Sequence, residues 1–218
     1  MSKRIILVHP YAPTMAPIIE AFARLWPQAQ VLNLLDESLY ADVGADGVLA
    51  ADVFDRIAAL LRHACASRAD GVIFTGATFS PAVEAARAAL ALPVLKADEA
   101  MCEEIAACRG RVAILCTAQR ALPVIRAGVE AAAMARGSSP PEIAEIWVEG
   151  AKDALVAGDG ARHDRLIAAA MEQLDACDML ALGQISMAPA RDLLTPERAA
   201  RVLSSPDASV HMMRKLLA

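Results

Sequence analysis

The sequence predicts an α/β protein in which parallel strands are covered by helices on both faces. Short apolar runs alternate along the whole chain with longer, alanine-rich segments of helical periodicity. The apolar runs are continuous rather than alternating with polar residues, which is typical of strands buried in a parallel sheet. With 218 residues, the chain is also long enough to bury a sizeable core.

The predicted elements follow from these two patterns in chain order. The apolar runs that we expect to be strands are Arg4–Val8, Gln30–Asn33, Gly71–Thr75, Val94–Leu95, Arg111–Thr117, Ile143–Val148, Met179–Gly183 and Val202–Ser204. The segments that we expect to be helices are Ala16–Trp26, Val48–Arg68, Pro81–Ala91, Glu99–Cys108, Ala121–Arg136, Lys152–Ala157, Gly160–Ala176, Pro196–Arg201 and Asp207–Leu217.

Two helix starts carry the same signal, a hydroxyl residue followed by proline. Ser80 precedes Pro81, and Thr195 precedes Pro196. Proline suits the first helical position, and Ser or Thr before it can cap the free backbone N–H groups. We therefore expect Ser80 and Thr195 to be N-caps.

The two halves of the chain show a weak internal similarity. The strand Gly71–Thr75 runs into TGATFSP, and the strand Met179–Gly183 runs into GQISMAP, so each half has a strand, a small polar loop and a proline. We expect two lobes, the first made of residues 1–97 with 202–218 and the second of residues 98–201.

Composition excludes several classes of partner. The net charge of −5 and the pI of about 5.4 leave no basic surface for nucleic acid. The start MSKRIILVHP lacks the long apolar segment of a signal peptide, and no run is long enough to span a membrane. Five cysteines without a CxxC motif indicate reduced thiols and a cytoplasmic protein. Low-aromatic, alanine-rich helices could form a dimer face, so a homo-oligomer is one expectation.

Ligands of parallel α/β sheets bind beyond the carboxyl ends of the strands, so four loops are candidates. HPYAPT contains His9, which could act as a general acid or base or could be structural. TGATFS contains Thr75, Gly76, Ala77 and Thr78, a dense set of small residues that suits a carboxylate or phosphate. An ordinary capped turn is the alternative for this second loop.

The other two loops follow strands in the second half. CTAQR offers Thr117 as a donor to an anion, whereas Cys116 is more typical of a buried apolar position than of a nucleophile. GQISMAP offers the amide of Gln184 and the hydroxyl of Ser186, which are neither strong acids nor strong bases. We expect these groups to position a ligand.

The sequence lacks the motifs of several other kinds of binding site and catalysis. The chain has no GxGxxG, no Walker loop and no GxSxG elbow. The four histidines, which are His9, His63, His163 and His211, show no metal-ligand spacing with one another or with the cysteines. We expect neither a metal site nor a cofactor.

Several segments together resemble the aspartate/glutamate/hydantoin racemase superfamily. They are LLDESL (Leu34–Leu39), FTGATFSPAVEAAR (Phe74–Arg87), PVLKADEAM (Pro93–Met101), VAILCT (Val112–Thr117) and LALGQISMAP (Leu180–Pro189). The resemblance implies two α/β lobes related by a pseudo-two-fold axis, with one substrate cleft between them. It also implies cofactor-independent chemistry in which one thiolate removes the α-proton of a small carboxylate and a second thiol returns one.

This chain departs from that pattern at both thiol positions. The motif TCS of related sequences aligns with Thr75-Gly76-Ala77, and the motif GCT aligns with Gly183-Gln184-Ile185. The resemblance thus places Gly76 and Gln184 where the two cysteines of a racemase stand. An arylmalonate decarboxylase of the same superfamily keeps the second cysteine, and this chain lacks that one as well.

Two functions therefore remain open. The first is a cofactor-independent racemase, isomerase or decarboxylase that acts on a small carboxylate with altered acid/base residues, with His9 as the candidate base. The second is a non-catalytic paralogue that binds a small anion in the same cleft. A third, weaker interpretation assigns the missing chemistry to Cys116.

Overall fold

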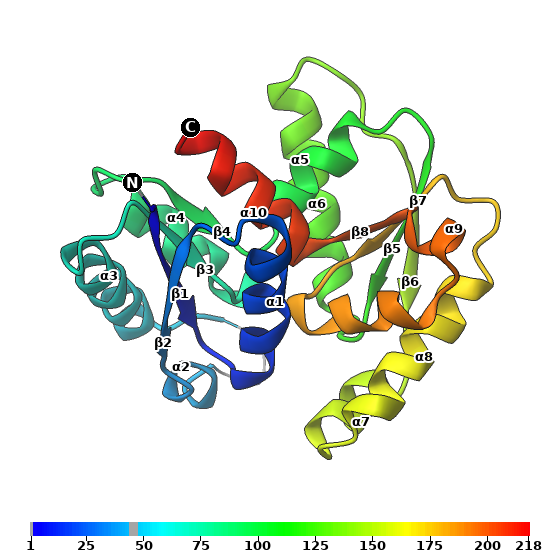
Figure 1. The fold of residues 1–218 in the computed structure, drawn as a ribbon, viewed down its shortest axis with the longest axis horizontal. Coiled ribbons are helices and arrows are strands. Elements are labelled where there is room, and N and C mark those ends of the chain that lie inside the picture. The colour runs from blue at the N-terminus through cyan, green and yellow to red at the C-terminus, as the bar shows by residue number, and fades with distance from the viewer. Residues whose placement is uncertain (1, 44–47) are drawn as a thin grey trace. The chain divides into compact units, whose positions relative to one another are not determined.

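Two parallel β-sheets organise residues 2–43 and 48–218, which are the residues that the computed structural model describes (Figure 1). The strands of the first sheet are β1 (Arg4–His9), β2 (Gln30–Leu35), β3 (Gly71–Phe74) and β4 (Val94–Lys96). The strands of the second sheet are β5 (Arg111–Cys116), β6 (Glu142–Trp147), β7 (Met179–Leu182) and β8 (Val202–Ser204).

The two sheets repeat one topology. The strand order is β2-β1-β3-β4 in the first sheet and β6-β5-β7-β8 in the second, and every neighbouring pair is parallel. The second sheet thus reproduces the order of the first with each strand number raised by four. This confirms the predicted fold class, two parallel-sheet α/β lobes covered by helices. The predicted cleft between them stays a prediction.

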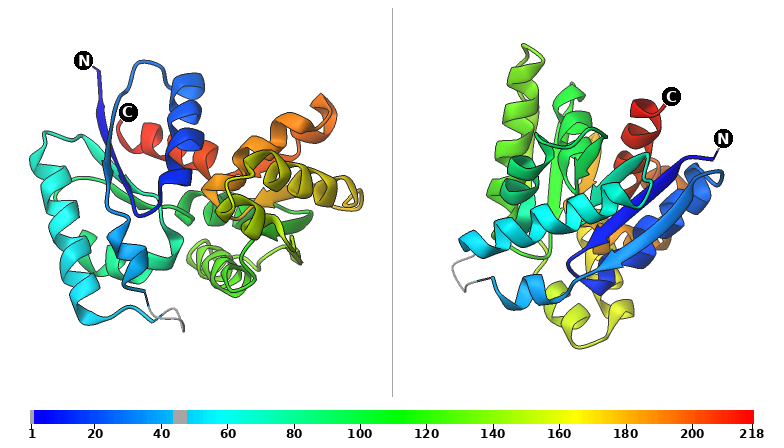
Figure 2. Two further views of the ribbon diagram at one scale, coloured as in Figure 1. Left: turned by 90° about the horizontal axis from the view of Figure 1, so that it is seen from below. Right: turned by 90° about the vertical axis from the view of Figure 1, so that its left-hand side faces the viewer.

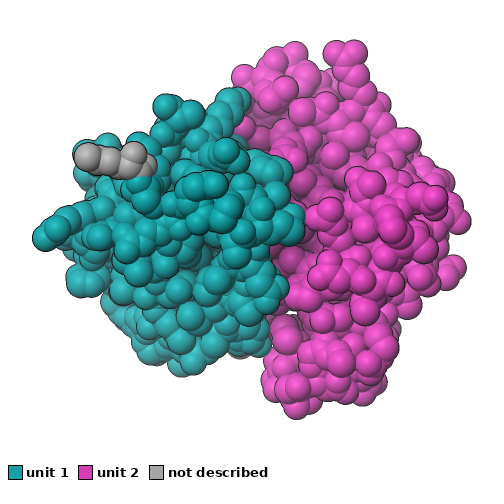
Figure 3. Space-filling view, in the orientation of Figure 1, with its two compact units in different colours: residues 1–97, 209–218 teal, residues 98–208 magenta. Residues whose placement is uncertain are grey.

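The first compact unit comprises residues 1–97 and 209–218, coloured teal in Figure 3. Its helices include α1 (Met15–Leu25), α2 (Ser38–Ala41), α3 (Ala51–Ala66) and α4 (Ser80–Arg87). Figures 1 and 2 show α3 and α4 on one face of the sheet and α1 on the other. The core between α3, α4 and the sheet is fully buried and includes Ile6, Val8, Ile57 and Phe74.

The second compact unit comprises residues 98–208, coloured magenta in Figure 3. Its helices are α5 (Glu99–Ala107), α6 (Ala121–Ala135), α7 (Ala151–Val156), α8 (Gly160–Glu172) and α9 (Pro196–Ala199), and α10 (Ser205–Leu216) begins in this unit and ends in the first. Helices α5 and α6 pack together, and α8 packs on α7 and on the 3₁₀ helix Ile185–Leu193. The core here includes Leu115, Ile167, Leu182 and Met187.

The C-terminal tail divides differently from our expectation for residues 202–218. The sequence places this whole segment with the first lobe, but β8 hydrogen-bonds to β7 in the second sheet, with Leu180 paired to Val202. Backbone pairing therefore holds residues 202–208 in the second unit, and 209–218 alone fall in the first. Among the described residues, no helix combines the length and the apolar character that a membrane crossing requires.

Helix ends differ from the sequence predictions for local reasons. Helix α3 ends at Ala66 because Arg68 has a left-handed backbone (φ 59°), which cannot continue a right-handed helix. The predicted N-cap at Ser80 is wrong, because a 3₁₀ turn at Ala77–Phe79 precedes α4 and makes Ser80 its first residue. Thr195 does stand at the N-cap of α9, although its side chain makes no capping hydrogen bond.

Candidate functional site

The predicted site residues lie where expected within each unit, at the carboxyl ends of the strands. In the first unit His9 ends β1, and Thr75 and Gly76 follow β3. In the second unit Thr117 follows β5, and Gln184 follows β7. Parallel strands bring these ends to one edge of each sheet, so each unit carries its own cluster.

His9 is the centre of a buried polar network in the first unit. Its ring is fully buried, and Nε2 lies 3.0 Å from Asn33 Oδ1. A carbonyl oxygen only accepts, so Nε2 carries the proton and Nδ1 is the acceptor. The Thr14 hydroxyl donates to the carbonyl of Tyr11 at 2.7 Å, which leaves the Thr75 hydroxyl to donate to Nδ1 at 2.9 Å.

Burial determines the protonation state of this ring. It lowers the pKa of His9 below its usual value, and the hydrogen bond to Asn33 opposes this shift in part. His9 is therefore neutral at pH 7, with both ring nitrogens engaged inside the protein. This arrangement fits the structural interpretation of His9, in which the ring orients Thr75. A catalytic role for His9 stays a prediction.

Sequence reasoning missed the partners Asn33 and Thr14. Asn33 was a visible signal, as a polar residue inside the apolar run QVLNLL. Thr14 was visible only as one hydroxyl of the HPYAPT loop. Neither signal shows that both side chains belong with a histidine, since Asn33 is 24 positions away from it along the chain.

Gly76 has no room for a side chain. A Cβ atom built there would lie 2.4 Å from Cγ of Pro10 and 3.0 Å from Phe79 Cδ2. The Pro10 ring is constrained, so it cannot swing aside as a flexible side chain would. The position that the resemblance assigns to the first thiol is therefore filled by Pro10 and Phe79.

Aromatic side chains border this loop. The chain has only two tyrosines, Tyr11 and Tyr40, and their rings lie edge-to-face with centroids 5.8 Å apart. Tyr40 also packs on Phe79 at 5.1 Å, and its hydroxyl lies 3.4 Å from that of Thr78. Burial raises the pKa of Tyr11, and Tyr40 and Glu37 raise it further, so its phenol is protonated at neutral pH.

The remaining predicted residues of this loop have different surroundings. Ala77 and Thr78 lie in the 3₁₀ turn after Gly76. Ala77 is half-buried, whereas Thr78 is exposed and therefore open to a ligand. Thr75 is buried, and its hydroxyl is already engaged with His9. Of the hydroxyls predicted here, that of Thr78 is the accessible one.

In the second unit, Gln184 reaches across to the end of β5. Its Oε1 accepts from the backbone N–H of Thr117 at 2.7 Å and from the Thr117 hydroxyl at 2.8 Å. The N–H of Ala118 lies further away, at 3.4 Å from the same oxygen. The structure thus brings together Thr117 and Gln184, two residues predicted from separate loops. Ser186 is half-buried in the following 3₁₀ helix.

Cys116 is sealed in the core of the second unit. Its side chain is fully buried, and its Sγ would lie 2.5 Å from a Cβ built on Gly183. Burial, with a smaller contribution from Glu145, raises the pKa of Cys116 to about 12. The thiol is therefore protonated and inaccessible, which argues against the nucleophile interpretation.

A hollow of about 240 Å³ lies beside Thr117. Its lining also includes Arg120, Trp147, Lys152 and Asp153. The Trp147 indole N–H donates to the Thr117 carbonyl at 3.3 Å, which fixes the ring against the strand end. Sequence reasoning missed Trp147, because nothing in the strand sequence EIAEIW showed that this last side chain would be 43% exposed.

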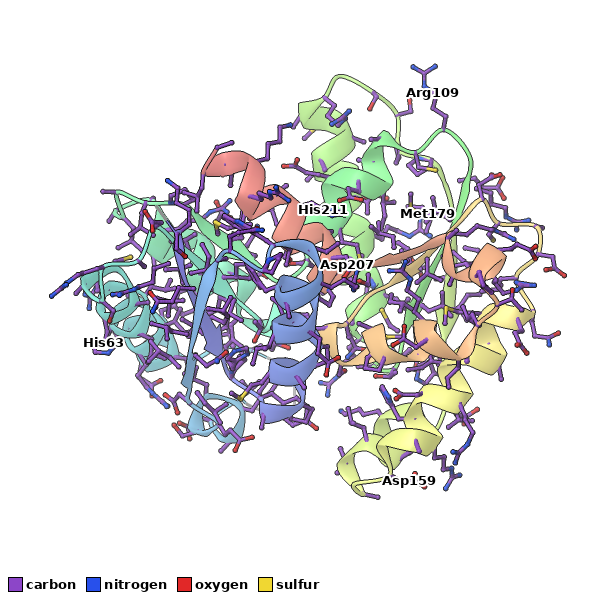
Figure 4. The ribbon with its side chains drawn as sticks, in the orientation of Figure 1. His63, Arg109, Asp159, Met179, Asp207 and His211 are labelled. Carbon is purple, nitrogen blue, oxygen red and sulfur yellow. The ribbon has the colours of Figure 1, made fainter. Side chains whose placement is uncertain are left out.

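Metal ligands do not gather in the described part of the chain. No group of three or more His, Cys, Asp or Glu side chains is placed to hold a metal ion there. His63 on α3 and His211 on α10, both labelled in Figure 4, stand apart in the first unit. His163 is buried on α8 and pairs with Asp164 at 2.7 Å.

A comparison with protein-family models shows the family of this chain. The model of the Asp/Glu/hydantoin racemase family matches residues 12–213, which is most of the chain. The chain belongs to the Asp/Glu/hydantoin racemase family. The resemblance inferred from the sequence segments is thereby confirmed. A comparison with curated proteins found no match.

Solved structures of the racemase family share this fold. Allantoin racemase from Klebsiella pneumoniae superposes with a TM-score of 0.70 at 20% identity, covering 99% of this chain and 88% of that one. Glutamate racemase from Francisella tularensis, in complex with D-glutamate, gives a TM-score of 0.66 at 13% identity and covers 99% and 81%. Arylmalonate decarboxylase gives 0.60 at 20% identity and covers 100% and 93%. At these identities the likeness shows the fold.

Proposed function

We propose that this racemase-family protein binds a small carboxylate at the carboxyl ends of its strands, using hydrogen-bond donors. The observation that carries the proposal is that the strand-end loops of each unit present hydrogen-bond donors, whereas neither predicted thiol position carries an acid or a base. Gln184, Thr78 and Ser186 supply amide and hydroxyl groups. Donors of this kind suit the oxygens of a carboxylate or of the enolate derived from it.

The residues at the predicted thiol positions, together with Cys116 and His9, argue against proton transfer by two thiols. Gly76 and Gln184 carry no thiol, and Pro10 fills the space beside Gly76. Cys116 is buried with its pKa raised to about 12, and His9 is neutral with both ring nitrogens engaged. Racemisation needs a group that removes the α-proton, so ordinary two-base racemisation is not part of this proposal.

Cofactor-independent decarboxylation is the second candidate, because it needs no base. The bond between the α-carbon and a carboxylate breaks, carbon dioxide leaves, and the electron pair stays on the α-carbon as an enolate. Donors stabilise that enolate, and a proton from water then completes the product. Donors without a base at the predicted thiol positions suit this step better than they suit racemisation.

Thermal unfolding in the presence of small anions tests the proposal. We expect acetate, malonate or aspartate to raise the Tm saturably, since a ligand at 100 times its Kd adds about 2.7 kcal/mol to the unfolding free energy. Chloride at equal ionic strength is the control. If no small carboxylate raises the Tm beyond the chloride control, the proposal fails. Release of carbon dioxide from malonate would favour the second candidate.

A further inference from the structure

Gln184 holds its carboxamide in one orientation. Three donors face the same side-chain atom: the Thr117 N–H, the Thr117 hydroxyl and, at longer range, the Ala118 N–H. A backbone N–H can only donate, so the atom that faces both of them must be the amide oxygen. The assignment of oxygen and nitrogen in this side chain therefore follows from the chemistry of its neighbours.

This anchoring leaves the NH₂ group of Gln184 available. Within residues 2–43 and 48–218, the amide nitrogen donates to no other group. It is also not among the polar side-chain atoms that are buried without a partner, which are His163 Nε2 and Ser209 Oγ. Because the Gln184 side chain is half-buried, its NH₂ group stays partly exposed at the carboxyl end of β7, while its oxygen is held by Thr117 and Ala118.

We propose that the Gln184 NH₂ group is a fixed hydrogen-bond donor to a negatively charged oxygen of the ligand. This inference rests on the proposed function and assigns its main donor in the second unit. Fixing the amide in advance avoids the ordering cost that a mobile side chain would have on binding. At the position assigned to the second thiol, a thiol would transfer a proton, whereas an amide N–H donor stabilises negative charge on the ligand.

The alternative is that Gln184 blocks the site. In that case its oxygen stands in for a ligand oxygen on the donors of Thr117 and Ala118, and removing the side chain would free them. The two interpretations predict opposite effects of Gln184→Ala. Loss of the side chain weakens binding if Gln184 is a donor and strengthens binding if Gln184 is a plug.

Gln184→Glu is the sharper variant. A glutamate can keep the contacts to Thr117 with one oxygen, while the outward NH₂ group becomes a second, negatively charged oxygen. The variant therefore preserves the anchor and reverses the group that faces the ligand. Gln173→Glu is the matched control, because it adds the same charge at the exposed C-cap of α8.

The test is the Kd of malonate for the full chain and its variants, measured by calorimetry, with Tm values confirming folding. We expect Gln184→Glu and Gln184→Ala to weaken binding at least about tenfold, since hydrogen bonds to charged groups carry about that much affinity. Gln173→Glu should change the Kd less than twofold.

The outcomes separate the two proposals. Unchanged affinity in Gln184→Glu, or tighter binding in Gln184→Ala, overturns the donor role and leaves the proposed function standing. If the wild-type protein binds neither malonate nor acetate, the proposed function falls and the donor role falls with it. An amide ¹⁵N signal of Gln184 that shifts with malonate in the wild type supports the donor role directly.

Discussion

The two units repeat one sheet topology, yet they differ at the positions that the resemblance assigns to the racemase thiols. In the first unit, Gly76 lies against Pro10 and Phe79, so the position has no space. In the second unit, Gln184 extends a full side chain from the equivalent strand end and anchors it on Thr117. The first position is closed by packing, whereas the second presents a polar group.

The polar groups behind the two positions differ as well. Inside the first unit the Thr75 hydroxyl donates to His9 Nδ1 at 2.9 Å, and the Thr14 hydroxyl donates to the Tyr11 carbonyl at 2.7 Å. Gln184 satisfies donors of the second unit with its oxygen and keeps its nitrogen open. The first unit thus engages its buried polar groups with one another. The second unit instead holds the oxygen of a side-chain amide and leaves the NH₂ group of that amide as a donor.

The largest effect should come from the buried network of the first unit. His9→Ala leaves a cavity and removes the partner of Thr75 and Asn33, so we expect the free energy of unfolding to fall by about 3 kcal/mol. Urea denaturation measures it. His63→Ala, at an exposed position on α3, is the control and should stay within about 0.5 kcal/mol. A loss below about 1 kcal/mol for His9→Ala would contradict the structural role.

A methyl group at Gly76 should destabilise the protein next most strongly. The Cβ of Gly76→Ala would meet the Pro10 ring at 2.4 Å, and overpacking of this kind costs about 1–3 kcal/mol. Gly160→Ala is the matched control, because nothing lies within 4 Å of its Cβ at the start of α8. Equal unfolding midpoints in urea for Gly76→Ala and the wild type would show that the position is open.

Loss of the anchored Gln184 amide should lower the free energy of unfolding somewhat less than Gly76→Ala does. Gln184→Ala leaves the buried N–H and hydroxyl of Thr117 without their partner, so we expect a loss of about 1–2 kcal/mol in unfolding free energy. Gln184→Glu keeps an acceptor oxygen there and should lose less than half of that. If both variants lose the same amount in urea denaturation, the oxygen is not the anchoring atom.

The pH dependence of stability should report the burial of His9 in the first unit. The pKa of His9 is lowered in the folded protein, whereas in the unfolded chain the same imidazole has its ordinary pKa of about 6.5. Below about pH 6.5 the unfolded state therefore binds a proton that the folded state does not, and stability falls with acidification. The slope due to His9 is at most about 1.4 kcal/mol per pH unit and should be missing in His9→Gln. Identical slopes in urea titrations would assign the dependence to other groups.

The smallest effect should be at Cys116. With its thiol buried and its pKa raised to about 12, we expect no labelling by iodoacetamide in the folded protein at pH 8, as read by peptide mass spectrometry. Protein unfolded in urea is the control in which Cys116 becomes labelled. Rapid labelling of the folded protein would show that the Cys116 thiol is accessible and reactive.

Local patterns predicted the sheets most clearly where a strand is a contiguous apolar run. The runs at Arg4–His9 and Arg111–Cys116 are buried almost from end to end, so the sequence alone marks them. The 3₁₀ helix Ile185–Leu193 escaped prediction, because its proline at 189 argued against a helix there. The pairing of Val202 with Leu180 escaped too, since no local pattern says which lobe a tail joins.

The candidate site was predictable in its residues and not in its contacts. The resemblance predicted that Gly76 and Gln184 stand at the two thiol positions of a racemase. It did not show that Pro10 fills the space beside Gly76, or that Gln184 reaches Thr117 across 67 positions of sequence. Such contacts depend on the register and packing of the sheets, which single residues do not encode. The expectations of a cytoplasmic, cofactor-free protein that avoids nucleic acid and forms a homo-oligomer stay predictions.

The central claim is that this racemase-family protein binds a small carboxylate with fixed donors and without a base. One proton NMR experiment on malonate in D₂O tests it, because saturation transfer reports binding and loss of the methylene signal without formation of acetate reports proton transfer. The account predicts saturable binding with methylene exchange no faster than in a protein-free sample. Exchange accelerated by the protein, or the absence of binding, would contradict the claim.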